Sequence, residues 1–293
     1  MAEGRIIKAL SGFYYVKTDE GIYACKGRGV FRKRKITPLV GDFVSFDINN
    51  EVEGYITEVK QRKNELIRPP IANIDQAVIV NAATMPSFSS LLLDRFLILI
   101  EAKHIKPIIF INKMDKATKE EMNMMQRYKE DYEQIGYHVE LLSAKDTIDY
   151  DDIKQYLPNK VTVFAGQSGV GKSSILNALQ PSLILKTASI SKSLGRGKHT
   201  TRHVELVEVN SGLVADTPGF SNLDLTEIKL EQLGACFPEI REIQHHCKFR
   251  GCLHSKEPHC AVKEAVEDGR IRSYRYEHYV SFLEEIQTRK PRY

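Results

Sequence analysis

The sequence lacks any apolar run that approaches the roughly 20 residues a membrane-spanning helix requires. Its first residues, MAEGRIIKAL, also lack the apolar segment and the cleavage site of a secretory signal peptide. These absences argue against membrane and secreted proteins, so we expect a cytoplasmic protein with no membrane partner. Cysteine is scarce, with five in 293 residues, and in a reducing cytoplasm disulfides are the weaker explanation for them.

The residues that are present are typical of a soluble globular protein, with 42% hydrophobic residues, 27% charged residues and a mean hydropathy of −0.32. The length permits two or three domains. Positive charge exceeds negative charge at both ends: residues 1–68 hold 13 Lys and Arg against 9 Asp and Glu, and residues 236–293 hold 11 against 9. Such ends could hold a polyanion, although a solvated loop is the alternative for the densest cluster. That cluster comprises Lys26, Arg28, Arg32, Lys33, Arg34 and Lys35.

Residues 1–68 contain short alternating stretches bounded by Gly, Asp or Asn, with no pattern of helix length. This pattern predicts several strands joined by turns, and therefore an all-β barrel. A five-stranded OB-type barrel that binds RNA is favoured, because such barrels commonly bind oligonucleotides and the loops here are basic. An SH3-like barrel would give much the same pattern.

The period changes after Arg68-Pro69-Pro70, which the prolines predict to be a stiff extended linker. Apolar runs such as 76–81, 107–111 and 161–165 now alternate with helical stretches, which predicts a parallel sheet covered on both faces. Ligands bind at the carboxyl ends of the strands in such sheets. We expect this α/β domain over residues 69–233 and a third, mainly helical domain over residues 234–293.

A phosphate-binding loop follows the run 161–165 and opens a helix. It comprises Gly166, Gln167, Ser168, Gly169, Val170, Gly171, Lys172, Ser173 and Ser174. The glycines let backbone N–H groups turn toward phosphate oxygens, and the helix N-terminus adds its positive dipole end. Lys172 would neutralise the β and γ phosphates, and the hydroxyl of Ser173 would bind Mg²⁺.

A base-reading motif follows the run 107–111, also at the end of a predicted strand. Its members are Asn112, Lys113, Met114 and Asp115, and a second string of Ser143, Ala144 and Lys145 follows the next strand. The carboxylate of Asp115 can accept from both N1–H and N2–H₂ of guanine, whereas adenine offers no such pair of donors. Together these strings predict a guanine pocket.

A third nucleotide motif, Asp216-Thr217-Pro218-Gly219, ends the apolar stretch 213–215. Asp216 suits Mg²⁺ binding, and the N–H of Gly219 can detect the γ-phosphate. The basic segment 195–202 predicts a switch whose threonine, Thr200 or Thr201, closes over Mg²⁺, with a merely flexible loop as the alternative. Because the base-reading motif precedes the phosphate loop, the reverse of the usual order, the sequence predicts a circularly permuted GTPase.

Four metal-binding side chains lie close together near the C-terminus, namely Cys247, Cys252, His254 and Cys260. This C-x4-C-x-H-x5-C spacing lets them converge on one tetrahedral Zn²⁺, which would be structural because no coordination position stays open. His245, His246 or His259 could replace one ligand. Cys25 and Cys236 are isolated and are expected to be small buried side chains.

Basic and aromatic residues alternate after the metal ligands. Arg270, Arg272 and Arg275 lie among tyrosines, a composition that suits RNA. The spacing of Tyr279, Phe282, Leu283 and Ile286, however, is that of the packing face of a helix, and the core interpretation is favoured for these aromatics.

The order of these motifs, between a basic β-rich segment and a Cys/His cluster, resembles the ribosome small subunit-dependent GTPase A family (RsgA, also called YjeQ or YloQ). The resemblance covers essentially the whole chain. It implies an N-terminal OB-fold, a circularly permuted GTPase domain and a C-terminal zinc domain that includes His254 as a ligand. It further implies a monomer that acts in late maturation of the small ribosomal subunit, binds its rRNA and hydrolyses GTP when that subunit stimulates it.

The sequence gives the least information about the catalytic step. Phe220 stands where Ras-like enzymes carry a water-positioning glutamine, and neither Gln nor His occurs from Phe220 through Glu231. We therefore expect slow hydrolysis by the isolated chain, with His199 and His203 as candidate groups. The segment Phe220–Leu233 leads into the zinc domain, so we hypothesise that hydrolysis reorients that domain and releases RNA.

Two other functions compete with this one. A P-loop kinase acting on a small molecule would leave Asp115 unexplained. A non-catalytic, GTP-bound RNA-binding assembly scaffold is the alternative that the missing glutamine suggests.

Overall fold

The computed structural model describes residues 1–27, 31, 36–49, 52–143, 153–179, 204–216 and 223–289. They divide into two compact units. The first contains residues 1–78, 147–165 and 171–221, and the second contains residues 79–146, 166–170 and 222–293. In the described part of the chain, no helix is long and apolar enough to cross a membrane.

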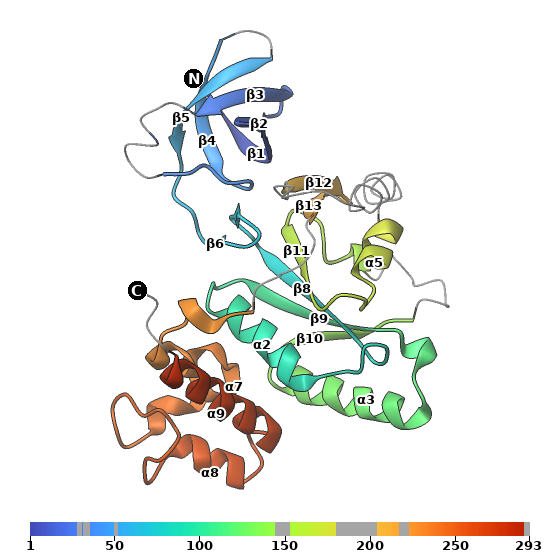
Figure 1. The fold of residues 1–293 in the computed structure, drawn as a ribbon, viewed down its shortest axis with the longest axis vertical. Helices are drawn as coiled ribbons and strands as arrows, with labels where there is room; N and C mark the ends of the chain where they lie inside the picture. The colour runs from blue at the N-terminus through green and yellow to red at the C-terminus, as the bar shows by residue number, and fades with distance from the viewer. Residues whose placement is uncertain are drawn as a thin grey trace. The chain divides into compact units, whose positions relative to one another are not determined.

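Five strands at the start of the first unit form a closed barrel (Figure 1). They are β1 (Ala2–Leu10), β2 (Phe13–Lys17), β3 (Ile22–Gly27), β4 (Phe43–Ile48) and β5 (Glu53–Val59). The order is β1-β2-β3-β5-β4, and β4 pairs again with β1. Because β3 and β5 run parallel, the barrel has the OB topology that the alternating pattern predicted. Side chains that are fully buried fill it: Ile6, Val16, Cys25, Val44, Phe46 and Ile56.

The prediction of an extended linker at residues 68–70 is wrong. The chain turns back there, so that β6 (Glu65–Leu66) pairs antiparallel with β7 (Ile71–Ala72). The Arg68–Pro69 bond in the turn is cis. Proline restricts the backbone in a tight turn as it does in an extended segment, so its presence did not distinguish the two.

The first unit continues with three strands and one helix. They are β11 (Val161–Ala165), α5 (Lys172–Leu179), β12 (Glu205–Val209) and β13 (Gly212–Asp216). Strand β13 pairs parallel with β11 and antiparallel with β12, and β12 pairs with β1 of the barrel. Strand β12 therefore joins the sheet of the nucleotide motifs to the barrel.

The second unit contains the strands that end at the base-reading motif. They are β8 (Gln76–Ala82), which begins in the first unit, β9 (Lys106–Asn112) and β10 (His138–Leu141). Strands β9 and β10 are parallel. Every residue of β8, and every residue of β9 after Lys106, is buried, as the continuous apolar runs predicted. The helices α2 (Ser90–Glu101) and α3 (Lys119–Gln134) connect these strands.

Side chains that satisfy backbone N–H groups fix the start of both helices. Ser89 accepts a hydrogen bond from the N–H of Leu92 at 3.2 Å. Thr118 and Glu121 form a capping box, in which each side chain accepts from the other's backbone N–H. These contacts set the first residues of α2 and α3.

The C-terminal part of the chain is mainly helical (Figure 1). Its α-helices are α7 (Pro238–Ile243), α8 (Ala261–Glu267) and α9 (Ser273–Thr288), and short 3₁₀ turns occur at 225–227, 230–232, 234–236 and 244–246. The predicted face of α9 is buried in a core that also includes Ile98 of α2. The C-terminal helices therefore pack on α2 within one unit.

A buried ion-pair network crosses this packing. Arg275 of α9 is 1% exposed and donates two hydrogen bonds to Glu239 of α7, at 2.7 and 3.1 Å. It also donates to Asp94 of α2, which accepts further bonds from Tyr132 at 2.6 Å and lies 2.6 Å from Nδ1 of His278. Burial opposes the charge of Arg275, but Asp94 and Glu239 outweigh it and hold the pKa of Arg275 well above its usual value.

Candidate nucleotide-binding site and metal cluster

The base-reading motif and the phosphate loop meet in the second unit. Asn112, the last residue of β9, is 2% exposed, and its Nδ2 donates to the carbonyl of Val170 at 3.0 Å. Its backbone carbonyl accepts from the N–H of Ala83 at 2.9 Å, and the N–H of Met114 donates to Leu142 at 3.0 Å. The carboxyl ends of β8, β9 and β10 are thereby joined beneath one segment of the loop.

Lys113 strengthens this junction. Its backbone is left-handed, with φ 64°, and its ammonium group donates to the carbonyl of Gly169 at 2.6 Å and to that of Met85. A lysine that bonds two carbonyl oxygens holds a loop in place. This bracing role was not evident from the motif alone.

Glycine is required at the first position of the phosphate loop. A Cβ atom on Gly166, whose φ is +135°, would lie 2.1 Å from the carbonyl oxygen of Val80. Gly169 and Gly171 also have positive φ, +82° and +103°. The loop can therefore lie against β8 and turn its N–H groups outward, as a phosphate cradle requires.

The loop leads directly into α5, whose first residues are Lys172, Ser173 and Ser174. Both serines are exposed. Burial lowers the pKa of Lys172 below its usual value. An anion beside the ammonium group would reverse that shift, because an opposite charge favours the charged form.

Two buried acceptors at the base-reading end have no hydrogen-bond partner among the described residues. They are Oδ1 of Asn112 and Oγ of Ser143. Unpaired buried polar atoms are costly, so these two favour a polar ligand that completes them. The N–H groups of a guanine fit this requirement.

Several predicted site residues lie outside the described residues. These are Ala144, Lys145, Thr200, Thr201 and Gly219, together with His199, His203 and Phe220. Asp216 is the last residue of β13, and its side chain lies outside the described part of the structure. Asp115 lies in a 3₁₀ turn directly after Lys113 and Met114.

The four predicted metal ligands converge. One ligand atom from each of Cys247, Cys252, His254 and Cys260 lies within 4.8 Å of all the others. The Sγ atoms of Cys247 and Cys252 are 3.9 and 3.8 Å from that of Cys260, and Nδ1 of His254 is 3.3 Å from it. Zn–S bonds of about 2.3 Å in a tetrahedron place sulfurs about 3.8 Å apart, so the set fits one metal ion.

Neighbouring groups hold the ligand loop. Glu257 accepts from the N–H groups of Leu253 and Ser255 at 2.8 and 2.9 Å, and Tyr276 donates to the carbonyl of His254 at 2.7 Å. His254 is 1% exposed, and its burial lowers its pKa, which keeps the ring neutral and able to coordinate. Among the described residues, the converging set does not include the alternative ligands at positions 245, 246 and 259.

The arginines that alternate with tyrosines are held in ion pairs. Arg270 pairs with Asp268, and Arg272 with Asp131. Arg275, which we had grouped with them, is buried in the network described above and was missed as a structural cation. Its spacing could have revealed it, because it lies four residues before Tyr279 on the buried face of α9.

Comparison with known proteins agrees with this geometry. The family described as RsgA GTPase matches residues 59–226, which is more than half of the chain, and the family described as RsgA N-terminal domain matches residues 3–56. The chain belongs to the RsgA GTPase family. As a member of the RsgA family, it is a GTPase.

Curated RsgA proteins match along their whole length. The small ribosomal subunit biogenesis GTPase RsgA 2 of Oceanobacillus iheyensis is 63% identical over 293 residues, with 100% of both chains covered. The small ribosomal subunit biogenesis GTPase RsgA of Bacillus subtilis is 60% identical over 298 residues, again with 100% of both covered.

Solved RsgA-family structures share the fold. The structure described as YloQ, a circularly permuted GTPase, is 56% identical, with a TM-score of 0.86, and the match covers 100% of this chain and 97% of that one. YjeQ from Thermotoga maritima is 36% identical, with a TM-score of 0.86 and coverage of 98% and 99%. The predicted architecture of an OB-like barrel, a circularly permuted GTPase and a mainly helical C-terminal domain with a Cys₃His cluster is confirmed.

Proposed function

We propose that this GTPase acts in late maturation of the small ribosomal subunit, binds its rRNA, and is released when GTP is hydrolysed. Relatives with 60% identity or more are named small ribosomal subunit biogenesis GTPases, and they match this chain from end to end. The observation that carries the nucleotide part is the bond between Asn112 and Val170, because it joins a guanine-type motif to a phosphate loop.

The roles of the site residues follow from their chemistry. Asp115 would accept from guanine N1–H and N2–H₂, with Ser143, Ala144 and Lys145 completing the base pocket. The loop from Gly166 to Ser174 would hold the phosphates, with Lys172 against the β and γ groups. Ser173 and Asp216 would hold Mg²⁺, which would neutralise charge on the phosphates, and Thr200 or Thr201 and Gly219 would close the site.

The metal cluster is proposed to hold one structural Zn²⁺ on Cys247, Cys252, His254 and Cys260. Three thiolates and a neutral imidazole are a donor set that favours zinc, and they leave no position for a substrate. The ion would hold the ligand loop together, and the hydroxyls of Tyr276 and Tyr279 on α9 donate to the carbonyls of His254 and Leu253 in that loop.

We further propose a monomer in the cytoplasm with domains over residues 1–68, 69–233 and 234–293. The first of these would bind RNA through its barrel, the second GTP, and the third zinc. Potassium dependence is not expected, since Gly169 stands where potassium-activated GTPases carry an asparagine.

Steady-state GTP hydrolysis tests the proposal. The rate is measured with no addition, with small ribosomal subunits and with large subunits, and Lys172→Ala serves as the inactive control. We expect slow turnover that small subunits alone stimulate. Equal rates with small and large subunits would refute the ribosomal role, and no multiple turnover under any condition would favour the non-catalytic scaffold.

A further inference from the structure

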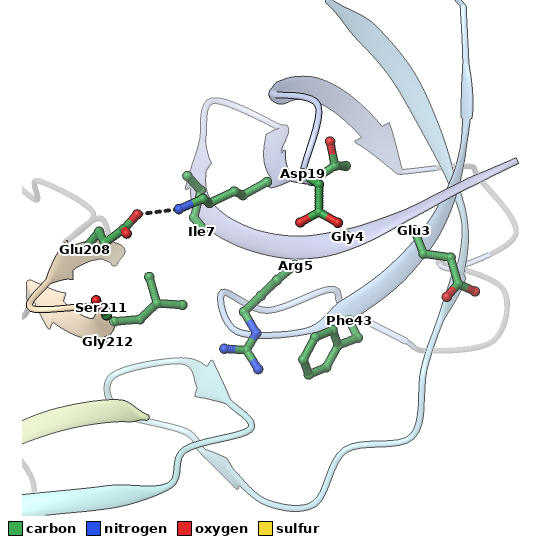
Figure 2. A pocket seen from close by; sticks show the side chains of 12 residues that line it. Glu3, Gly4, Arg5, Ile7, Asp19, Phe43, Glu208, Ser211 and Gly212 are labelled. Atoms are coloured by element: carbon green, nitrogen blue, oxygen red, sulfur yellow. Dashed lines mark hydrogen bonds and ion pairs between the residues drawn. The ribbon is translucent and has the colours of Figure 1, made fainter. Parts of the chain in front are cut away.

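Two lysines of the barrel are bound to two glutamates of β12. Nζ of Lys8 in β1 lies 3.1 Å from Oε2 of Glu205, and Lys17 in β2 bonds Glu208. Figure 2 draws the second pair as a dashed line from Glu208, beside a cavity of about 490 Å³. All four residues belong to the first unit.

The same lysines lie on an aromatic face of the barrel. Lys8 stands opposite Tyr15 in the β1–β2 ladder, with its Nζ 5.9 Å from the ring centroid. Along β2, Phe13, Tyr15 and Lys17 alternate with buried Val16, so they share the outer face. Phe13 stands opposite Lys26 of β3, whose Nζ is 4.9 Å from its ring. Rings beside cations stack bases and bind phosphates in single-stranded nucleic-acid sites.

The two ion pairs are easily exchanged. The side chains of Lys17 and Glu208 are 42% and 62% exposed, and those of Lys8 and Glu205 are 31% and 26% exposed. An exposed pair changes an equilibrium constant by at most about fivefold, because water competes for both charges. A chain of phosphates could therefore replace the two carboxylates.

We infer that Lys8, Tyr15 and Lys17 form a binding surface for single-stranded RNA that Glu205 and Glu208 occupy in the free protein. The carboxylates take the place of phosphates, so RNA and β12 compete for the same two ammonium groups. This inference rests on the proposed function and names where the RNA acts.

The competition has a consequence for the nucleotide site. Strand β12 continues through a tight turn into β13, which ends at Asp216. RNA that displaces Glu205 and Glu208 would remove two contacts between the barrel and β12, the strand that pairs with β13.

Fluorescence anisotropy of a labelled single-stranded oligouridine, titrated with the full chain at several salt concentrations, tests the competition. Glu205→Gln/Glu208→Gln is expected to bind about three- to tenfold tighter. The slope of log K against log salt should steepen by up to about 1.4, because in the wild type the two displaced carboxylates take up cations again and offset the release of ions from two phosphates, at about 0.7 for each phosphate. Glu208→Gln alone is expected to give about half of the change in slope, and Lys8→Gln/Lys17→Gln to bind more weakly than wild type.

Glu227→Gln/Glu285→Gln is the matched control. It removes two glutamates that also bind cations, Lys103 and Arg95, but lie in the other unit, so the net charge changes equally. Equal tightening in both double variants, or no tightening in Glu205→Gln/Glu208→Gln and in Glu208→Gln, would overturn the inference.

Stimulation by small subunits is measured in parallel on the wild type. If small subunits did not stimulate hydrolysis while the RNA competition was observed, the ribosomal function would be refuted and the inferred RNA-binding surface would remain supported. Stimulation without competition would refute the inference alone.

Discussion

Replacement of Arg275 by methionine removes a cation that two buried carboxylates share. Asp94 is fully buried and Glu239 is 9% exposed, so neither can recover its lost partner from water. Methionine keeps part of the apolar contact with Phe237, whose ring centroid lies 4.6 Å from the guanidinium carbon. The loss is therefore mainly electrostatic.

The magnitude follows from the burial. Breaking a buried ion pair by removing one partner costs about 3 to 5 kcal/mol. Nδ1 of His278 remains 2.6 Å from Asp94 and Tyr132 still donates to it, so we expect the lower end of this range, about 3 kcal/mol. Hydrogen exchange along α9 measures this directly, and 3 kcal/mol corresponds to about a hundredfold faster exchange of amides that open with the helix.

Arg272→Met is the matched control, because Arg272 directly precedes the same helix but is 47% exposed in its pair with Asp131. We expect less than about 1 kcal/mol for it. A combined Arg275→Met/Asp94→Asn/Glu239→Gln variant removes all three charges and should recover much of the loss. If α9 exchanged equally slowly in Arg275→Met and Arg272→Met, the network would not hold the helix.

Three further predictions concern the metal cluster and the phosphate loop. Burial raises the pKa of the Cys252 thiol to about 12 in the metal-free chain and also raises that of Cys260, so zinc must displace protons from these two thiols. Its affinity should therefore rise by about a hundredfold per pH unit near neutrality, and a pH-independent affinity in competition with a chelator would contradict this. Burial opposes the charge of Glu257, but the N–H groups that donate to it outweigh burial and hold its pKa below the usual 4.5. The stabilisation by its carboxylate is therefore present above pH 4.5 and is lost as the pH falls below that value. In unfolding titrations, Glu257→Gln should be less stable than wild type by about 1 kcal/mol at pH 7, and this difference in unfolding free energy should close in acid; a constant difference would contradict the argument. Gly166→Ala should cost about 3 kcal/mol in unfolding free energy because its Cβ would collide with the carbonyl of Val80, whereas Gly169→Ala, whose Cβ would meet only an atom 3.9 Å away, should cost about 1 kcal/mol; equal losses would refute the steric argument.

Local patterns predicted those parts of the molecule whose cause is local. The phosphate loop, the motif at Asn112 and the metal ligands each depend on residues a few positions apart, and continuous apolar runs marked β8, β9 and β11 as buried strands. The alternating pattern of the first 68 residues predicted a barrel but left two topologies open. Only the pairing of β3 with β5 distinguished them, because strand order depends on contacts distant in sequence.

The ion pairs of the fold could not be predicted from local sequence patterns. Arg275 and Asp94 are 181 residues apart, and Lys17 and Glu208 are 191 residues apart. No short stretch of sequence therefore contains both residues of either pair. Arginines among tyrosines suggested RNA as readily as a buried network. The turn at Arg68–Pro69 was missed for a related reason, because proline restricts the chain without specifying which restricted form the rest of the fold selects.

The strengths of these interactions bear on how hydrolysis could release RNA. We had hypothesised that the zinc domain reorients through the segment after Asp216. Ile98 of α2 lies in the same core as the C-terminal helices, and Arg275 binds Asp94 of α2, so a hinge between them would open a buried apolar core and separate a buried ion pair. The pair of Lys17 is exposed and that of Lys8 is half-buried, and each costs about 1 kcal/mol or less to exchange. We therefore expect the change to occur where β12 meets the barrel, with the C-terminal helices moving only together with α2.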